Sequence, residues 1–359
     1  MHVSAATPYT AVSSVPVLLR VRPTDMPHSP TELMDGFGRV HSDLRVSVTD
    51  RCNLRCAYCM PEEGMDHQPR AELLTFDEIV RVAEVAHSLG ISSVRITGGE
   101  PLVRRDLPTL IRRLASVGFD DLALTTNGMR LVRCAEDLVD AGLMRCNVSC
   151  DSLDPGLFSS IRRGGDLSVV LAAMDAAESS GLPPVKVNVV LIRGVNDHEV
   201  EEFAAFGRRT GRTVRLIEFM PLDADGQWKR SAVVPSEEIT SRINALWALQ
   251  PVDPPDMRDP APTTLFRFVD GGGEIGVVAT VTQPFCATCD RLRLAADGSV
   301  QNCLFSNDGF SVRDVIRSGG TDEAIAAVFR RAVTAKRAGL GTDDVSLVRP
   351  AHSMSMIGG

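Results

Sequence analysis

Two groups of three cysteines are the residues of this sequence best suited to chemistry. The N-terminal triad, Cys52, Cys56 and Cys59, follows the pattern C-x3-C-x2-C. Because an iron–sulfur cluster normally takes four cysteine ligands, three of them leave one iron open to another molecule. The alternative is structural zinc, but closed zinc sites take four ligands, usually as a C-x2-4-C pair followed by a second pair.

The C-terminal triad also has three cysteines, one fewer than the four ligands that such metal sites usually take. It consists of Cys286, Cys289 and Cys303, in the pattern C-x2-C-x13-C. Asp297-Gly298 predicts a hairpin turn that brings Cys303 back toward Cys289. Arg291 and Arg293 share the strand parity of Cys289 and are expected on its face. Structural zinc is again the alternative, but the missing ligand and the arginines favour a substrate-binding cluster.

The other cysteines do not suggest a third metal site. Cys150 shares the apolar strand parity of Val148, and Cys134 falls in a helical stretch. We expect Cys134, Cys146 and Cys150 to be buried, inert thiols.

Strand and helix patterns alternate along the chain and must position these residues. The predicted strands are Leu44 to Thr49, Ser93 to Thr97, Asp121 to Thr126, Arg145 to Cys150, Val185 to Leu191 and Thr213 to Phe219. The clearest helix spans Phe76 to Leu89, with a capping box of Thr75 and Glu78 and a stop at Gly90. Repeated βα units predict a parallel sheet with right-handed crossovers.

Every second residue of these strands is mostly polar, and this pattern distinguishes between two possible folds. Six units fall short of the eight that close a TIM barrel, so a doubly wound sheet and a partial barrel both remain. The polar positions include Arg45, Ser47, Thr49, Arg95, Thr97, Thr125, Asn147, Ser149, Lys186, Asn188 and Arg215. Strands covered on both faces are instead almost wholly apolar. The sequence therefore predicts a partial (βα)6 TIM-like barrel whose polar face encloses a polar ligand.

The remaining segments have distinct compositions. We predict a disordered leader over residues 1–40, the barrel over 41–222, and a linker over 223–262 with a crossing helix near Ser236 to Leu249. Residues 263–359 are expected to form a small C-terminal α+β region that carries the second cluster. Its predicted elements are the strands Leu265 to Val269 and Glu274 to Ala279, the hairpin, and a helix from Asp322 to Lys336.

Composition excludes several classes of protein. The chain has 359 residues, of which 44% are hydrophobic, as in ordinary globular proteins. Its net charge of -8 argues against a nucleic-acid binder with a broad basic surface, although a compact anionic ligand is compatible with it. No apolar run approaches the roughly 18 residues that span a bilayer, and no signal peptide is evident. We expect a cytoplasmic protein that binds neither nucleic acid nor membrane.

The N-terminal triad, with Tyr58 before its third cysteine, resembles the signature of the radical S-adenosylmethionine (SAM) superfamily. Gly98-Gly99-Glu100-Pro101 at the end of the second predicted strand is similar to that superfamily's second motif. A Gly-Gly after a strand would by itself indicate a tight turn. The resemblance implies that the open iron chelates the amino and carboxylate groups of SAM. One-electron reduction then releases a 5'-deoxyadenosyl radical.

Within that superfamily, the chain from about Asp43 to its end resembles the GTP 3',8-cyclases of molybdenum-cofactor biosynthesis. The similarity includes Thr125-Thr126-Asn127-Gly128, Cys289-Asp290-Arg291-Leu292-Arg293 and the tail Met356-Ile357-Gly358-Gly359. It implies two [4Fe-4S] clusters and conversion of GTP to (8S)-3',8-cyclo-7,8-dihydroguanosine 5'-triphosphate, the first step of molybdopterin biosynthesis. In the implied mechanism, the adenosyl radical removes hydrogen from ribose C3', and the carbon radical adds to guanine C8.

The resemblance also implies site residues. SAM would contact Tyr58, Gly99, Ser149 and Met220. GTP would contact Arg45, Arg95, Thr125, Lys186, Arg291, Leu292 and Arg293, with its guanine at the C-terminal cluster. Arginine suits the triphosphate because it stays charged and offers several donors in one plane. Gly358 and Gly359 would enter the site and act during catalysis.

Partners and rival functions follow from the same resemblance. The implied partners are a low-potential electron donor such as flavodoxin or ferredoxin, and the downstream cyclic pyranopterin monophosphate synthase; a homodimer is left open. One rival is a radical SAM peptide-modifying enzyme with an auxiliary cluster. Such enzymes usually carry more C-terminal cysteines and lack the Gly-Gly tail. The other rival is a zinc-stabilised nucleotide-binding regulator without turnover.

Overall fold

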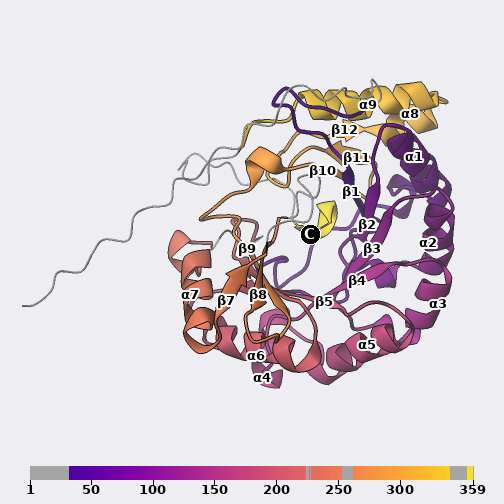
Figure 1. Ribbon diagram of the computed structural model, residues 1–359. Coiled ribbons are helices and arrows are strands. Elements are labelled where there is room, and N and C mark those ends of the chain that lie inside the picture. Colours follow the sequence, from indigo (N-terminus) through magenta and orange to yellow (C-terminus); the bar gives the residue numbers. More distant parts are fainter. Residues whose placement is uncertain (1–31, 224–225, 227, 253–261, 340–353, 359) are drawn as a thin grey trace, which may run out of the picture. The chain divides into compact units, whose positions relative to one another are not determined.

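Strand and helix segments alternate from Asp43 to Glu218 and build a parallel sheet in the computed structural model (Figure 1). The structure describes residues 32–223, 226, 228–252, 262–339 and 354–358. The strands are β1 (Asp43–Ser47), β2 (Ser93–Thr97), β3 (Asp121–Thr126), β4 (Arg145–Ser149), β5 (Lys186–Leu191), β6 (Val214–Glu218), β7 (Leu249–Pro251), β8 (Thr264–Phe268), β9 (Glu274–Val278), β10 (Arg291–Leu294), β11 (Ser299–Gln301) and β12 (Phe310–Ser311).

Helices cover one face of this sheet, as Figure 1 shows for α1 to α6. The helices are α1 (Phe76–Ser88), α2 (Leu107–Ala115), α3 (Ala135–Asp140), α4 (Pro155–Arg162), α5 (Leu167–Ser179), α6 (Val200–Thr210), α7 (Ser236–Leu246), α8 (Val312–Arg317), α9 (Asp322–Thr334) and α10 (Met354–Ile357). The apolar strand positions, such as Val46, Ile96 and Val187, pack beneath them and are fully buried. The predicted partial (βα)6 barrel is therefore confirmed.

Strands from the C-terminal third extend the sheet at both edges. The order is β12-β11-β10-β1-β2-β3-β4-β5-β6-β9-β8-β7, with β10 parallel to β1 and β9 parallel to β6. Edge strands present unpaired backbone groups, and these two pairings satisfy them at β1 and β6. The strands of the predicted small C-terminal α+β region thus belong to the same sheet as the barrel.

Local sequence signals place the predicted elements within a few residues of the observed ones. The capping box of Thr75 and Glu78 is present at the start of α1, and β10 and β11 form the hairpin expected at Asp297-Gly298. The helix predicted to reach Leu249 ends instead at Leu246, because Trp247 is extended and Leu249 begins β7. Apolar residues continue at helical spacing beyond Leu246, so the sequence pattern does not show where the helix ends.

Residues 32–40 are ordered, contrary to the predicted disordered leader, whose residues 1–31 lie outside the described residues. Met34 and Val40 form an antiparallel bridge, and Leu33 is buried. Arg39 pairs with Asp35 through an Nε–Oδ2 distance of 2.6 Å. Charged residues in a short polar segment resemble a solvated tail, yet their mutual pairing orders this one.

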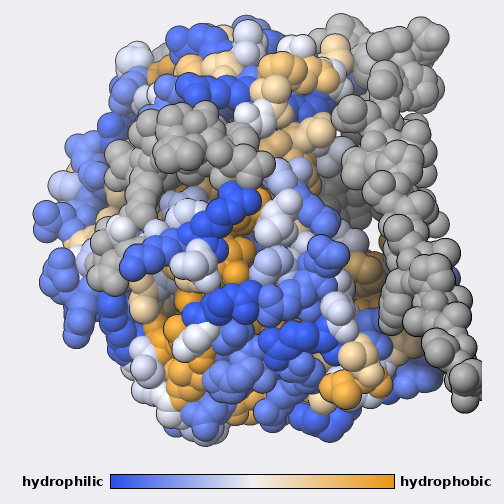
Figure 2. All heavy atoms as spheres, turned by 90° about the vertical axis from the view of Figure 1, so that its left-hand side faces the viewer, coloured by the Kyte–Doolittle hydropathy of each residue, from blue (hydrophilic) through white to orange (hydrophobic). Residues whose placement is uncertain are grey.

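Figure 2 shows the hydropathy of the residues on one face of the molecule. Hydrophilic residues cover most of that face, and hydrophobic ones gather in smaller areas between them. In the part of the chain that the structure describes, no helix is long and apolar enough to cross a membrane.

Candidate active site

Polar side chains from adjacent strands line up across the sheet. Arg45 of β1 is in register with Arg95 of β2 and with Arg293 of β10. Asn147 of β4 is in register with Lys186 of β5. Because residues in register point to the same face, the polar parity forms one continuous inner surface. That surface borders a cavity of about 290 Å³.

Both triads line this one cavity, together with most of the predicted ligand contacts. The predicted residues that line it are Cys52, Cys56, Cys59, Cys286, Cys289, Cys303, Tyr58, Gly99, Ser149, Met220, Arg45, Arg95, Thr125, Arg291 and Arg293. Lys186 is not among the lining residues; it is half-buried and lies in register with Asn147. Leu292 is wholly buried opposite Leu44, so its side chain does not reach the cavity. Gly359 lies outside the described residues.

The loop after β1 presents the N-terminal triad. A turn in which the Cys59 N–H donates to the Cys56 carbonyl at 2.9 Å sets the spacing of the last two cysteines. The Leu54 N–H donates to the Sγ of Cys52 at 3.4 Å, as it would to a thiolate ligand. Burial nevertheless raises the pKa of Cys52 to about 11, so nearby positive charge, such as that of iron, is needed to keep it ionised near neutral pH.

The Gly-Gly motif lies directly against this loop. The Gly99 N–H donates to the Thr49 carbonyl at 2.7 Å, and the Glu100 N–H donates to that of Arg51 at 2.8 Å. A Cβ on Gly99 would lie 2.5 Å from the Arg51 carbonyl oxygen. Only glycine permits this approach. Glu100 is buried and accepts from the Thr126 hydroxyl and the Asn127 N–H, each at 2.7 Å.

A buried ion pair beside the N-terminal triad was missed by the sequence reasoning. The Tyr58 hydroxyl donates to Asp151 Oδ2 at 2.9 Å, and Arg162 Nη2 lies 2.9 Å from the same oxygen. Burial disfavours charge on Arg162, but Asp151 and Cys56 outweigh it and raise the pKa of the guanidinium. Because Asp151 and Arg162 match no motif by spacing, only tertiary contact shows that they support Tyr58.

The C-terminal triad flanks the β10–β11 hairpin, with Cys286 and Cys289 before β10 and Cys303 after β11. Arg291 Nη2 donates to Cys289 Sγ at 3.2 Å, and the Phe305 N–H donates to Cys303 Sγ at 3.5 Å. Burial raises the pKa of the Cys289 thiol, but Arg291 and Lys336 outweigh it and lower that pKa to about 7. These donors suit thiolate ligands, so both triads fit iron–sulfur clusters.

The three cysteines of each triad do not converge on the position of a single metal ion. Among the described residues, no group of three His, Cys, Asp or Glu side chains is arranged to hold one metal ion. A cluster distributes its cysteine ligands over different irons.

Several cations crowd the cavity and repel one another. Burial, followed by the charges of Arg293 and Arg95, lowers the pKa of Arg45. Burial, followed by Arg215, lowers the pKa of Lys186 to about 8. Within the described part of the chain, the buried Nε atoms of Arg45, Arg95 and Arg291 have no hydrogen-bond partner. This arrangement provides donors and charge for an anionic ligand.

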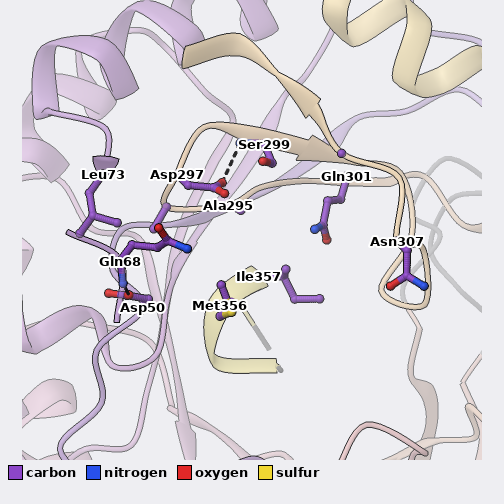
Figure 3. A pocket seen from close by; sticks show the side chains of 12 residues that line it. Asp50, Gln68, Leu73, Ala295, Asp297, Ser299, Gln301, Asn307, Met356 and Ile357 are labelled. Carbon is purple, nitrogen blue, oxygen red and sulfur yellow. Dashed lines mark hydrogen bonds between the residues drawn. The ribbon is translucent and has the colours of Figure 1, made fainter. Parts of the chain in front are cut away.

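The tail enters the same site. Figure 3 shows α10 beside a second cavity, of about 210 Å³, with Met356 and Ile357 among its lining residues. Ile357 is 1% exposed, and the Gly358 carbonyl accepts a hydrogen bond from Arg293 Nη1. Gly358 has a φ of 75°, and an added Cβ would collide with Thr97 Oγ1. Gly358 is therefore the residue at which the tail meets the cation cluster.

The remaining cysteines lie apart from the cavity. Cys146 and Cys150 are buried, and burial raises the pKa of Cys150 to about 12. Cys134 is half-buried, and burial raises its pKa to about 11. All three environments favour the neutral thiol.

Comparison with known proteins agrees with this geometry. Residues 46–207 match the Radical SAM superfamily, and residues 212–341 match the family Molybdenum Cofactor Synthesis C. The GTP 3',8-cyclase of Acidothermus cellulolyticus is 48% identical over 84% of this chain and 84% of its own length. That of Streptomyces coelicolor is 46% identical over 91% of this chain and 96% of its own.

A solved structure supports the fold. The crystal structure of Streptococcus suis SuiB bound to S-adenosylmethionine aligns with a TM-score of 0.56 at 13% identity, over 81% of this chain and 68% of that one. At this identity the likeness concerns the fold alone. From the two matched families and the extensive identity to curated relatives, the chain belongs to the GTP 3',8-cyclase family of the radical SAM superfamily.

Proposed function

We propose that this protein is a radical SAM enzyme that converts GTP to (8S)-3',8-cyclo-7,8-dihydroguanosine 5'-triphosphate, the first step of molybdenum-cofactor biosynthesis. The observation that carries the proposal is the single cavity lined by both cysteine triads and by arginines whose buried Nε atoms have no hydrogen-bond partner among the described residues. One triad alone would suit SAM cleavage. A second triad in the same cavity, together with several cations, suits a substrate that carries phosphates.

The N-terminal triad and its neighbours would bind SAM. When bound, the [4Fe-4S] cluster supplies the electron that cleaves SAM. Tyr58, Gly99, Ser149 and Met220 line the cavity and would contact SAM. Asp151 accepts a hydrogen bond from Tyr58 and pairs with Arg162. These contacts fix Tyr58, the residue before Cys59, in place.

The opposite wall would bind GTP. Arg45, Arg291 and Arg293 would hold the triphosphate, with Arg95, Thr125 and Lys186 as further contacts. Guanine would bind the open iron of the C-terminal cluster. Leu292 could contribute only through its backbone, because its side chain belongs to the core. Positioning GTP beside SAM and excluding water is the protein's part of catalysis.

The partners and location of the enzyme belong to the same proposal. A low-potential donor such as flavodoxin or ferredoxin would reduce the N-terminal cluster. Cyclic pyranopterin monophosphate synthase would consume the product, and the enzyme would act in the cytoplasm. A homodimer remains a prediction tested by its mass in solution.

An anaerobic turnover assay tests the function. The full chain is reconstituted with iron and sulfide, then given SAM, a chemical reductant and GTP. We expect 5'-deoxyadenosine and a cyclised nucleotide in equal amounts. With ATP in place of GTP, we expect no cyclised nucleotide. A reconstituted enzyme that cleaves SAM equally with and without GTP, and forms no cyclised product, contradicts the proposal.

A further inference from the structure

A buried lysine stands behind the C-terminal triad. Lys336 follows α9 and is 6% exposed. Its Nζ donates to the Arg291 carbonyl at 2.8 Å and lies 3.6 Å from Cys289 Sγ. Burying an ammonium group costs free energy unless it is paired and hydrogen-bonded, so this placement requires partners.

A chain of buried groups supplies those partners. Lys336 Nζ lies 3.4 Å from His41 Nδ1, and His41 Nε2 lies 3.2 Å from Asp35 Oδ2. Asp35 Oδ2 also accepts from Arg39 Nε at 2.6 Å. The side chains of Asp35 and His41 are fully buried. The segment before β1 therefore reaches the second cluster site, although it lies far from it in sequence.

Arg39 fastens the triad to the end of α9. Its Nη1 donates to the carbonyls of Cys286 at 2.6 Å and Ala338 at 3.0 Å. Its Nη2 donates to the Arg337 carbonyl at 2.6 Å. Because one rigid guanidinium joins both segments, Lys336 and the triad keep a fixed relation.

The sulfurs of Cys289 and Cys303 have different hydrogen-bond donors. Cys289 Sγ faces two cations, Arg291 Nη2 at 3.2 Å and Lys336 Nζ at 3.6 Å. Cys303 Sγ accepts from the neutral backbone N–H of Phe305. Hydrogen bonds to cluster sulfurs and nearby charge set the reduction potential of such clusters.

We propose that Lys336 is a positioning residue for the C-terminal cluster, which it tunes through Cys289. Its charge stabilises the more negative, reduced cluster and so raises the reduction potential. Its bond to the Arg291 carbonyl holds that arginine toward the substrate. The Asp35–Arg39–His41 network keeps the lysine in place. The inference rests on the proposed function, since it requires a cluster at this triad.

The test measures the cluster without requiring turnover. In the full chain carrying Cys52→Ala, Cys56→Ala and Cys59→Ala, only the C-terminal triad can load iron. Lys336→Met and Lys336→Gln remove the charge, and Lys336→Arg retains it. Arg337→Gln is the matched control, because its side chain is exposed and only its carbonyl meets Arg39. Iron per chain and an anaerobic redox titration followed by electron paramagnetic resonance are the readouts.

We expect at least one neutral variant to keep its iron and show a more negative reduction potential. Lys336→Arg and Arg337→Gln should match the parent. An unchanged potential in iron-loaded neutral variants overturns the inference. Loss of iron from both neutral variants also overturns it, because the lysine is then merely structural. If the parent triad itself binds no iron, it is the proposed function that fails.

Discussion

Arg45, Arg95 and Arg291 each hold a buried Nε at the same cavity, although their charges repel one another. Bound triphosphate would relieve that repulsion. Since a hydrogen bond to a charged group contributes roughly 1.5 to 3 kcal/mol, we expect Arg45→Ala or Arg291→Ala to weaken GTP binding roughly tenfold to hundredfold. Anaerobic titration calorimetry checks this, with the exposed Arg331→Ala as control. Equal GTP affinity in all variants would show that these arginines do not bind GTP.

Lys186 predicts a pH dependence of GTP binding. Burial and the charges of Arg215, Arg145 and Arg95 lower its pKa to about 8. The side chain is thus charged below that pH and neutral above it, so GTP affinity should fall as pH rises through about 8. Bound phosphate favours the charged form, and binding near this pH should take up a proton. Calorimetry in two buffers of different ionisation enthalpy measures that uptake. Lys186→Arg should abolish it while retaining binding, and an uptake that persists in this variant would assign the proton to another group.

At the scale of elements, α10 delivers Gly358 to Arg293 and Thr97. A side chain at Gly358 would collide with Thr97, and the positive φ adds strain. We expect Gly358→Ala, and deletion of Gly358 and Gly359, to suppress cyclised product while sparing both clusters and much SAM cleavage. Single-turnover yields of product and 5'-deoxyadenosine measure this. Gly36→Ala is the control, since nothing lies within 4 Å of its added Cβ. Wild-type product yield from the truncated chain would make the tail dispensable.

Glu218, the last residue of β6, joins this strand to the start of α7 and to the segment after β9. Its buried carboxylate accepts from the Ser236 N–H at the start of α7, and from the Val281 and Thr282 N–H groups after β9. Glu218→Gln leaves a buried donor facing a donor. We expect the free energy of unfolding to fall by roughly 1 to 3 kcal/mol. Chemical denaturation checks the loss, and an unchanged midpoint and slope would mean that the loop does not depend on this carboxylate.

At the scale of the whole molecule, we expect the two cysteine triads to have different functions. Replacing any cysteine of the N-terminal triad by Ala should abolish SAM cleavage, because the chelating iron is lost. Replacing any cysteine of the C-terminal triad should stop cyclisation but leave some uncoupled SAM cleavage. Iron analysis and 5'-deoxyadenosine formation measure both. Normal GTP turnover after loss of the second triad would refute an auxiliary role for it.

Short-range signals in the sequence determined the chemistry and the repeating elements of this protein. The spacing of Cys52, Cys56 and Cys59, the Gly98-Gly99 turn and the capping box at Thr75 act within a few residues, so they can be interpreted without a fold. Strand parity likewise predicted one polar face. Alternation along a single strand is a local property, and every strand carried it.

Only the tertiary structure decided what these parts face. The pairing of β10 with β1 brings the second triad to the cavity that the first triad lines. Strand order depends on edge pairing between distant segments, for which one sequence carries no local signal. For the same reason, the sequence does not show that Arg162 lies beside Tyr58. Nor does it show that Asp35 and Arg39 are linked to the second triad. A buried charge is recognisable only when its partners are known, and the contacts involved span 93 residues from Tyr58 to Asp151 and 247 from Arg39 to Cys286.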